Sequence, residues 1–445
     1  MNPQGQPDLD GAHHDVVVVG GGQAGLSMSY WLRQHGTDHL VLEKATVGNE
    51  WRERRWDNFC LVTPNWQCAL PGFPYVGPEP HGFMLRDEIV GYIEAYAKSF
   101  GPPLVQDTAA TRLTQRPSGG FEIRTSRGTL TADQVVVATG PYQVPVIPRM
   151  AQRLPDGVTQ LHSSGYRNPA LLPPGGVLVI GTGQSGGQIA EDLHLAGRAV
   201  HLATGSAPRV ARFYRGRDVV DWLEDMGYYA RSIDHFDDAD AVRFRANHYV
   251  TGRDGGRDID LRAFARDGMR LYGRLAGISG GVLRLAGDLR QNLDQADAVS
   301  ESIKDSIDSY IEARRITAPE EARYQPVWEP ANVPQVLDLE AARISTVIWA
   351  TGFGRDCRWI EIPVFDGRGY PTHRRGVTSC EGLYFLGLPW QHTWGSGRFC
   401  GVGADAGYLA DRIAAGPLRE MRWLAGTPVS TWPRDEEWAA PRTVA

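Results

Sequence analysis

Two glycine-rich segments, each directly after a short apolar run, constrain the fold of this chain more than any other feature. Residues 20–25 read Gly-Gly-Gly-Gln-Ala-Gly after the run 16–19, and residues 181–186 read Gly-Thr-Gly-Gln-Ser-Gly after the run 177–180. Each pattern predicts a buried strand that turns sharply into a helix, because glycines permit the tight turn and let backbone N–H groups approach a pyrophosphate. One such loop is weak evidence, but two in one chain predict two bound dinucleotides.

The residue after the second strand of each unit distinguishes the two predicted sites. Glu43 follows the apolar run 39–42, and its carboxylate can accept hydrogen bonds from both ribose hydroxyls of an unphosphorylated adenosine. The matching place after the second loop is Thr204, and Ser206 and Arg209 follow it. Hydroxyl and guanidinium groups suit a 2′-phosphate, so we expect FAD at the first site and NADPH at the second. A solvated basic turn is the alternative interpretation of this second segment.

The composition favours a cytoplasmic enzyme. The 445-residue chain has a formal net charge of −6 and a pI near 6.1, so we expect no nucleic-acid partner. Its longest apolar runs are far shorter than the ~20 residues that cross a bilayer, and residues 1–14 contain no signal-peptide pattern, so we expect no membrane association. Five cysteines form no Cys-x-x-Cys pair and no metal-ligand spacing, which predicts neither a redox disulfide nor a metal site.

The order of the patterns predicts one domain interrupted by another. We expect a disordered N-terminus (1–14), an FAD-binding domain (15–155 and 325–415), an inserted NAD(P)H-binding domain with a helical insertion (156–324) and a C-terminal tail (416–445). Two apolar strands, near 134–140 and 344–352, end in the same Ala-Thr-Gly sequence. Apolar residues at helical spacing predict an amphipathic helix over 298–313.

Further motifs occur in a fixed order along the chain. They are Gly48-Asn49-Glu50-Trp51, the stretch 64–71, His162 with Tyr166, and Ala350-Thr351-Gly352-Phe353. Together with the paired loops, they resemble the class B flavin monooxygenases, which include flavin-containing monooxygenases and the plant indole-pyruvate monooxygenases. The resemblance covers about 15–415 and implies an α/β fold of two Rossmann-like dinucleotide-binding domains, with the NADPH domain inserted into the FAD domain.

Three segments carry a closer resemblance, to bacterial flavin oxidoreductases encoded beside a nitrilase in a cyanide-assimilation cluster. These segments are 61–68, 211–218 and 393–399. The class B resemblance implies that NADPH reduces FAD, that O2 is activated as a C4a-(hydro)peroxyflavin, and that a small nitrogen-containing or carbonyl substrate is oxygenated. The chemistry belongs mostly to the cofactor, so no catalytic triad is expected. A homodimer is a possible assembly.

The candidate site residues follow from the loops and from the resemblance. We expect Gly20, Gly22, Gly25 and Glu43 to hold the adenosine half of FAD, and Gly181, Gly183, Gly186, Thr204 and Arg209 to hold NADPH. Other cofactor-binding candidates are Gln23, Ala24, Trp51, Thr139, Gly140, Gln184, Ser185, Ser206, Gly352, Gly401 and Gly403. The resemblance implies that a helix beginning near Gly401–Gly403 directs its N-terminus at the flavin, where its dipole stabilises reduced flavin.

Two catalytic candidates and one departure complete the site prediction. The resemblance implies an asparagine beside the flavin, but Val62 occupies that position, with Thr63 and Asn65 as polar neighbours. We take Asn65 as a catalytic candidate, and Arg398 as a second one that anchors an anionic substrate or the pyrophosphate. A surface salt bridge is the alternative for Arg398.

Three functions therefore remain open. The first is an NADPH-dependent flavin monooxygenase, and the second is a flavin oxidoreductase or oxidase that inserts no oxygen, which the Val62 departure favours. The third is a non-catalytic flavin-binding partner. An intact second loop argues against this last option, because a protein that only binds flavin has little use for NADPH.

Overall fold

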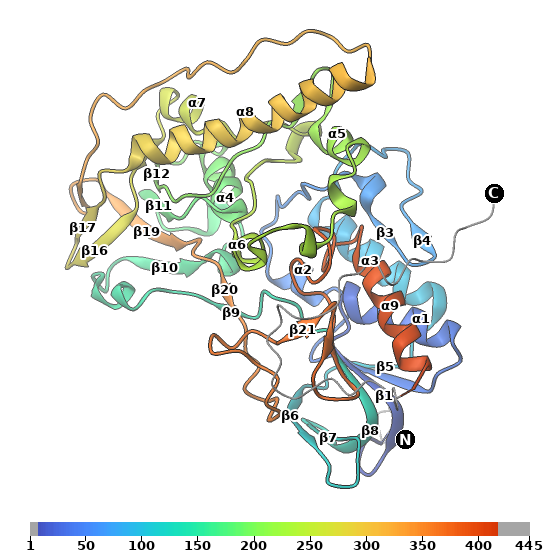
Figure 1. Ribbon diagram of the computed structural model, residues 1–445. Helices are drawn as coiled ribbons and strands as arrows, with labels where there is room; N and C mark the ends of the chain where they lie inside the picture. The colour runs from blue at the N-terminus through green and yellow to red at the C-terminus, as the bar shows by residue number, and fades with distance from the viewer. Residues whose placement is uncertain (1–7, 417–445) are drawn as a thin grey trace.

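The computed structural model describes residues 8–416 and contains two α/β domains of closely similar design (Figure 1). Each domain has a central parallel sheet, and one strand of each sheet leads directly into one of the two glycine loops. Helices cover one face of each sheet, and an antiparallel meander packs on the opposite side. The predicted fold class is confirmed, including the insertion of the second domain into the first.

The sheet of the first domain is ordered β21-β22-β23-β8-β1-β2-β5, and β6 and β7 extend it as an antiparallel meander from β8. Its strands are β1 (His13–Val19), β2 (His39–Leu42), β5 (Leu104–Val105), β6 (Ala110–Gln115), β7 (Phe121–Thr125), β8 (Gly128–Val137), β21 (His373–Arg374), β22 (Val377–Thr378) and β23 (Leu383–Phe385). Its helices are α1 (Gln23–Gln34), α2 (Asn49–Glu53), α3 (Arg86–Phe100) and α9 (Val402–Ala414). A short hairpin, β3 (Ala69–Leu70) with β4 (Phe73–Pro74), lies outside the sheet.

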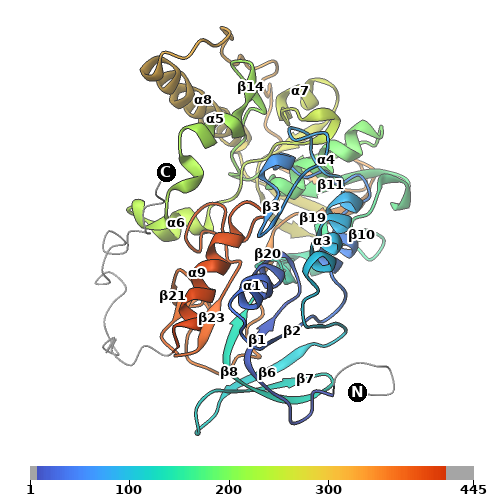
Figure 2. The same cartoon turned by 90° about the vertical axis from the view of Figure 1, so that its right-hand side faces the viewer.

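The alternation of β1 explains how this domain is layered. Val16 and Val18 pack with the helices on one face, whereas Val17 and Val19 belong to the core on the other face. Figures 1 and 2 both show α9 beside α1, although more than 360 residues separate them in the sequence. Distant segments are thus packed together: the start of α1 bonds the loop before α9 through Gln23 and Gly397, and Trp31 of α1 bonds Gly403 of α9.

The second domain has the parallel order β10-β19-β11-β12-β15. Its strands are β10 (Thr159–His162), β11 (Gly176–Ile180), β12 (Val200–Ala203), β15 (Arg270–Tyr272) and β19 (Ile344–Trp349), with a meander of β16 (Leu275–Ser279), β17 (Val282–Leu285) and β18 (Val336–Asp338). Its helices are α4 (Gln184–Leu195), α5 (Val219–Asp225), α6 (Ala239–Phe244), α7 (Leu261–Arg266) and α8 (Leu289–Arg314), and a hairpin joins β13 (Phe213–Tyr214) to β14 (Arg217–Asp218). Short 3-10 helices lie at Asn65–Gln67, Arg149–Arg153, Ser163–Gly165, Pro169–Leu171, Tyr228–Ala230, Ile233–His235 and Arg253–Gly255.

The two connections between the domains pair with each other. The outgoing strand β9 (Val144–Pro145) is antiparallel to the returning strand β20 (Phe353–Gly354), and the Val146 N–H donates to the Gly352 carbonyl at 3.0 Å. His162 adds a side-chain contact, because its Nε2 lies 2.9 Å from the same Gly352 oxygen. The second domain is thus attached through a two-stranded connection.

The boundaries differ from the predicted ones in two places. Strand β19 lies between β10 and β11, so the chain returns to the first domain after Trp349 and not at residue 325. Part of the predicted disordered segment 1–14 is ordered, since β1 begins at His13 and Leu9 is buried in the first-domain core. Residues 1–7 and 417–445, which include nearly all of the predicted tail, lie outside the described part. Helix α8 includes the predicted helix 298–313 and begins earlier.

Candidate active site

The first glycine loop has the geometry of a phosphate-binding turn. Gly20 has a φ of +113°, and a Cβ there would lie 2.5 Å from the Ala138 carbonyl oxygen. At Gly25 a Cβ would lie 1.7 Å from the Gly20 carbonyl oxygen, so only glycine fits. Nothing lies within 4 Å of the Cβ position at Gly22, which leaves open space at the start of α1. The loop therefore closes tightly on the strand side and stays open on the helix side.

The second loop repeats these features residue by residue. Gly181 has a φ of +103°, and its Cβ would lie 2.6 Å from the Ala350 carbonyl oxygen. The Cβ of a side chain at Gly186 would lie 1.9 Å from the Gly181 carbonyl oxygen, whereas the position at Gly183 is open. The residues packed against the two loops, Ala138 and Ala350, begin the two Ala-Thr-Gly sequences. These sequences therefore have a packing role at each site.

The helices that start at the loops lack the side-chain cap that three helices of the second domain have, as do α2 and α8. Helices α5, α6 and α7 each begin at an aspartate whose carboxylate accepts from a backbone N–H of the first turn: Asp218, Asp238 and Asp260. Helices α1, α4 and α9 begin at Gly22, Gly183 and Gly401 without a side-chain cap. The first N–H groups of α1 and α4 can therefore be satisfied by an anionic ligand such as a pyrophosphate. At the start of α9 the N–H groups of Val402 and Ala404 already donate to the carbonyl oxygens of Arg398 and Gly401.

Glu43 is held rigidly at the end of β2. Its Oε2 accepts from the Gly21 N–H at 2.7 Å, and its Oε1 accepts from the Ala45 N–H at 2.9 Å. The side chain is half-buried beside the loop. This is the place that the predicted ribose contact requires, and the assignment of Glu43 to the adenosine half of FAD stays a prediction.

The corresponding residues of the second domain have other partners. The Thr204 hydroxyl is buried, donates to the Tyr272 carbonyl oxygen at 2.8 Å and accepts from Asn292 Nδ2 at 3.1 Å. The Thr204 N–H also donates to the Tyr272 carbonyl oxygen, at 2.9 Å, so both its hydroxyl and its N–H are occupied within the protein. Ser206 is exposed, and the Gly205 N–H donates to the Thr182 hydroxyl at 2.9 Å. No carboxylate takes the place of Glu43 here.

Arg209 lies in a buried ionic network beneath α8, with 3 % of its surface exposed. Its Nε donates to Asp297 at 2.6 Å, and its guanidinium stacks 4.0 Å from the ring centroid of Tyr324. Burial lowers the pKa of Arg209, but Asp297 outweighs this effect and the pKa is raised, so the group stays charged. Its Nη2 has no hydrogen-bond partner, and binding of a 2′-phosphate by Arg209 remains a prediction.

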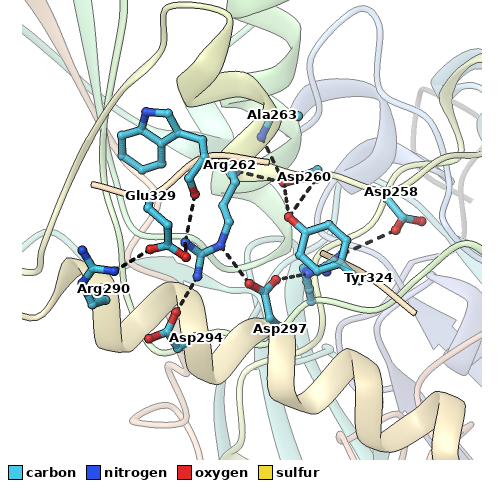
Figure 3. Close-up of polar contacts among 11 residues, drawn as sticks. Asp258, Asp260, Arg262, Ala263, Arg290, Asp294, Asp297, Tyr324 and Glu329 are labelled. Atoms are coloured by element: carbon cyan, nitrogen blue, oxygen red, sulfur yellow. Dashed lines mark hydrogen bonds and ion pairs between the residues drawn. The ribbon is translucent and has the colours of Figure 1, made fainter. Parts of the chain in front are cut away.

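The rest of that network surrounds a second buried arginine. Figure 3 shows Arg262 between Asp294, Asp297 and Glu329, with distances of 2.5, 2.8 and 3.1 Å. A buried guanidinium without a carboxylate partner would destabilise the fold. The three carboxylates that pair with Arg262 therefore hold α7, α8 and the segment around Glu329 in a fixed arrangement. Asp297 contacts both Arg262 and Arg209, so the position of Arg209 depends on the whole network.

The N-terminus of α9 is enclosed by close backbone packing. A Cβ at Gly401 would lie 2.5 Å from the Gly395 carbonyl carbon, and a Cβ at Gly403 would lie 2.9 Å from Pro71 Cγ. In the first turn, buried Asp405 accepts from the Ser396 hydroxyl at 2.5 Å. Burial raises the pKa of Asp405, although Ser396 and Arg375 act in the opposite direction. The loop before α9 is thereby fixed onto the helix.

A glutamine at the start of α1 and another at the start of α4 fix the two glycine loops in a similar way. Gln23 of α1 donates to the Gly397 carbonyl oxygen at 3.1 Å, which joins the first glycine loop to the α9 loop. Gln184 of α4 donates to the Val250 carbonyl oxygen at 2.6 Å. Both glutamines thus position their helix N-termini by a backbone contact far away in the sequence.

The remaining cofactor candidates lie around these loops. Gly140 and Gly352, with φ of +70° and +87°, end the two Ala-Thr-Gly sequences. Thr139 is exposed and accepts from Gln143 Nε2 at 2.8 Å, and Trp51 stacks on Phe399 with 5.8 Å between ring centroids. Ala24 and Ser185 lie in the first turns of α1 and α4.

The two catalytic candidates have quite different surroundings. Both ends of the Asn65 amide are used, since Nδ2 donates to the Glu79 carbonyl oxygen and Oδ1 accepts from the Met84 N–H, each at 2.9 Å. Arg398 stacks 3.9 Å from the Trp394 ring centroid and donates to Asn247 Oδ1 at 2.9 Å. Asn65 therefore fixes a surrounding loop, whereas Arg398 contacts a segment of the other domain.

That segment was missed by sequence reasoning. Residues 228–247 of the second domain, which we call the strap, lie across the loop before α9. The Ile233 N–H donates to the His392 carbonyl oxygen at 2.6 Å, and Tyr229 lies 4.6 Å from Trp394 between ring centroids. Four aromatic residues within 228–244 were the available signal: Tyr228, Tyr229, Phe236 and Phe244. The strap covers the side of the site where Arg398 lies.

The described residues also limit other chemistry. Within 8–416 no group of three or more His, Cys, Asp and Glu side chains could hold a metal ion. In that same part of the chain, no helix is both long and apolar enough to span a membrane.

Comparisons with known proteins agree with this geometry. The family model described as pyridine nucleotide-disulphide oxidoreductase matches residues 17–226. An "uncharacterized oxidoreductase CzcO-like" of Geobacillus kaustophilus is 35% identical over 90% of this chain and 98% of its own length. Indole-3-pyruvate monooxygenase YUCCA4 of Oryza sativa subsp. japonica is 33% identical over 42% of this chain and 45% of its own length. A flavin-containing monooxygenase from Stenotrophomonas maltophilia has the same fold, with a TM-score of 0.62, 20% identity, and 91% and 99% of the two chains covered.

The fold and the paired loops define a two-nucleotide oxidoreductase of the flavin monooxygenase type. More narrowly, the chain belongs to the CzcO-like oxidoreductases, because its Geobacillus relative matches over nearly the whole of both chains. The predicted resemblance to class B flavin monooxygenases and the prediction of an oxidoreductase enzyme are thereby confirmed.

Proposed function

We propose that this protein is an FAD-dependent, NADPH-reduced monooxygenase that oxygenates a small nitrogen-containing or carbonyl compound. The observation that carries the proposal is the pair of glycine loops, each followed by a helix without a side-chain cap. FAD and NADPH are its two cofactors. When bound, FAD takes hydride from NADPH and passes electrons to O2.

The residues of this chain position the cofactors and exclude water. Gly20, Gly22 and Gly25 bring backbone N–H groups to the FAD pyrophosphate, and Glu43 holds the ribose. The uncapped N-terminus of α9 provides positive potential for a reduced flavin. The strap covers this region, where a dry site protects the activated oxygen from water. Arg398, beneath the strap, holds an anionic group of the substrate.

The substrate class rests on two supports. The YUCCA4 relative is named for indole-3-pyruvate, a carbonyl acid, and Arg398 offers a guanidinium with further N–H donors beside an indole ring. Asn65 acts as a positioning residue, through the backbone of residues 79–84 that its amide holds.

The test is the fate of oxygen during NADPH oxidation. With a screened amine, oxime, aldehyde or 2-oxo acid, the monooxygenase forms product labelled from ¹⁸O2, and hydrogen peroxide release per NADPH falls. Equal amounts of peroxide and NADPH with every compound, and no labelled product, would overturn the proposal.

The same outcome would support the second candidate, an NAD(P)H-dependent flavin oxidoreductase or oxidase without oxygen insertion. One observation favours this candidate: both ends of the Asn65 amide bond backbone groups, and Val62 has no polar side chain to offer a bound flavin.

Nucleotide preference is tested at the turn 204–209. Ser206→Glu places a carboxylate at an exposed position beside the second loop, so it should lower kcat/KM for NADPH relative to NADH by about tenfold, through repulsion of the 2′-phosphate. Arg209→Ala should act in the same direction if Arg209 reaches that phosphate. An equal loss with NADPH and NADH would assign Arg209 to stability alone.

A further inference from the structure

A buried arginine outside the glycine loops joins the two domains. Arg212, which directly precedes β13 in the second domain, has 1 % of its surface exposed. Its Nη1 donates to the Val62 carbonyl oxygen of the first domain at 2.8 Å, and its Nη2 donates to Asp218 at 2.6 Å. The guanidinium also lies 4.7 Å from the ring centroid of Phe83, another first-domain residue. Arg212 is therefore held from both sides of the domain boundary.

Two glycines of the loop 250–257 make this contact possible. A Cβ at Gly252 would lie 2.1 Å from the Leu61 carbonyl oxygen and 2.6 Å from Phe83 Cγ. A Cβ at Gly256 would lie 2.8 Å from both Arg212 Cδ and Phe83 Cε2. The loop thus fits between the domains only because these positions lack side chains. We call the set Leu61, Val62, Phe83, Arg212, Gly252 and Gly256 the interdomain clamp.

The clamp is connected to the second glycine loop. In α4, the helix that starts at this loop, Gln184 donates to the Val250 carbonyl oxygen at 2.6 Å. One turn further, Gln188 donates to the Cys60 carbonyl oxygen of the first domain at 3.1 Å. The N-terminal half of α4 is therefore fixed to the segment around Cys60 and to the loop that precedes Gly252.

The clamp is also connected to α9. The first-domain segment continues from Val62 to Pro71, and Pro71 lies against Gly403 at the start of α9. Along the way, residues 64–68 form a turn in which the N–H groups of Gln67 and Cys68 donate to the carbonyl oxygens of Pro64 and Asn65. A short, packed path thus joins the helix N-terminus of the second loop to the helix N-terminus on the flavin side.

We infer that Arg212 is a positioning residue that fixes the NADPH-binding domain against segment 60–71, and so sets the distance between the two cofactors for hydride transfer. The inference rests on the proposed function. Hydride transfer needs donor and acceptor in near-contact, so a displacement of about 1 Å lowers its rate by about 100-fold. Binding of each nucleotide to its own loop does not depend on this alignment.

The experiment is anaerobic stopped-flow reduction of the bound flavin by NADPH in the holoenzyme, with Gly252→Ala as the main variant. Gly252 has an ordinary φ of −92°, so alanine is compatible with its backbone and the added methyl group acts through its clash with Leu61 and Phe83. We expect the limiting rate constant to fall by 10- to 100-fold while the apparent Kd for NADPH changes less than threefold. Arg212→Lys keeps the charge but loses the planar guanidinium, so its limiting rate constant should lie between those of Gly252→Ala and the wild type.

Two controls separate alignment from general damage. Gly255→Ala changes a glycine of the same loop that has nothing within 4 Å of its Cβ position. Because its φ is +83°, alanine strains the backbone more at Gly255 than at Gly252, so backbone strain alone would affect the control more. Arg217→Ala removes an arginine of the same segment that pairs with Asp225 instead. Both should reduce flavin at the wild-type rate, and dithionite should reduce all variants equally.

Hydrogen exchange of the flavin-free proteins gives a readout independent of catalysis. Amides in 58–66 and 249–257 should exchange faster in Gly252→Ala than in Gly255→Ala. A wild-type limiting rate of flavin reduction in both Gly252→Ala and Arg212→Lys would overturn the inferred role of Arg212. Equal hydrogen exchange in Gly252→Ala and Gly255→Ala would do the same. Failure of NADPH to reduce even the wild-type flavin would instead overturn the proposed function.

Discussion

The two glycine loops have closely matching backbones, but the hydrogen bonds that close them run in opposite directions. In the first domain the loop N–H of Gly21 donates to a side chain after the second strand, Glu43. In the second domain the N–H after the second strand, that of Gly205, donates to a loop side chain, Thr182. In each domain one side chain thus joins the second residue of the glycine loop to the segment that follows the second strand.

This difference separates the residues that determine the backbone turn from those that determine which nucleotide fits. The first and third glycines of each motif are required by contacts of 1.7–2.6 Å, so they determine the turn whatever nucleotide binds. The closing side chain determines the charge at the ribose end: a carboxylate in the first domain and a hydroxyl in the second. A 2′-phosphate would be repelled by Glu43 and has no such neighbour beside Ser206.

The largest expected effect comes from substituting the third glycine of each loop, Gly25 or Gly186. Gly25→Ala places a methyl group 1.7 Å from a carbonyl oxygen, so the first domain should lose FAD and the protein should be purified colourless or insoluble. Gly186→Ala, with 1.9 Å, should leave a yellow protein whose flavin NADPH no longer reduces. The flavin spectrum and anaerobic reduction measure both effects. The open positions offer matched controls, since Gly22→Ala and Gly183→Ala should fold normally.

The second effect compares buried histidines on the second strand of each sheet. Burial, with a smaller contribution from Arg270, lowers the pKa of His201 from 6.5 to about 4, and burial lowers that of His39 as well. Both are neutral when folded but take up a proton when unfolded, so stability is lost as pH falls from about 6.5 towards 4. For His201 the loss is about 3 kcal/mol at the low end. His201→Phe should flatten the pH dependence of the unfolding free energy measured by denaturant titration.

A pH dependence that persists unchanged in His201→Phe would show that other groups cause it. The same experiment with His39→Phe tests whether the domains unfold together. In a single cooperative transition, each substitution flattens the same curve, whereas separate transitions respond to one substitution each.

The third effect sharpens the assignment of the ribose end. Glu43→Gln removes the charge that two backbone N–H groups share and that we predict a ribose to share, so the Kd for FAD should rise by about 10- to 100-fold. Isothermal titration of the flavin-free protein measures it. An unchanged Kd would mean that Glu43 only supports the loop.

The smallest effect concerns Thr204, which has the same place in the second domain. Its hydroxyl bonds Tyr272 and Asn292, so Thr204→Val should lower the unfolding free energy by about 1–2 kcal/mol. The KM for NADPH should change less than threefold. A larger change in KM would place the Thr204 side chain on the nucleotide and make the two domains more alike than their hydrogen bonds indicate.

Much of the fold could be predicted because the decisive contacts are local. Gly25 and Gly186 are required by carbonyl oxygens only five residues away, those of Gly20 and Gly181. The strand partners of β19 could not be predicted in this way. Residues 344–349 are mostly apolar and are followed by the same Ala-Thr-Gly as β8, so the sequence pattern fits either sheet, and only pairing with β10 and β11 decides.

Site prediction had the same limit. The loop glycines and Glu43 follow a fixed spacing, but the partners of Arg209, Arg212 and Asn65 come from distant segments. A run of arginines in 209–217 suggests a solvated basic patch, whereas Arg209 and Arg212 are almost fully buried against aspartates and aromatic rings. Charge and spacing identify a candidate, but long-range packing determines what it contacts.

The paired strands β9 and β20 have a consequence for the order in which the chain is made. The second domain is complete once Trp349 has been synthesised, whereas the first still lacks β23, which pairs with β8, and α9, which packs on α1. On the ribosome, the inserted domain can therefore fold first, while the edge of β8 that later pairs with β23 still has no strand partner. A chain terminated between 355 and 380 should release a folded nucleotide-binding domain attached to an incomplete, aggregation-prone partner.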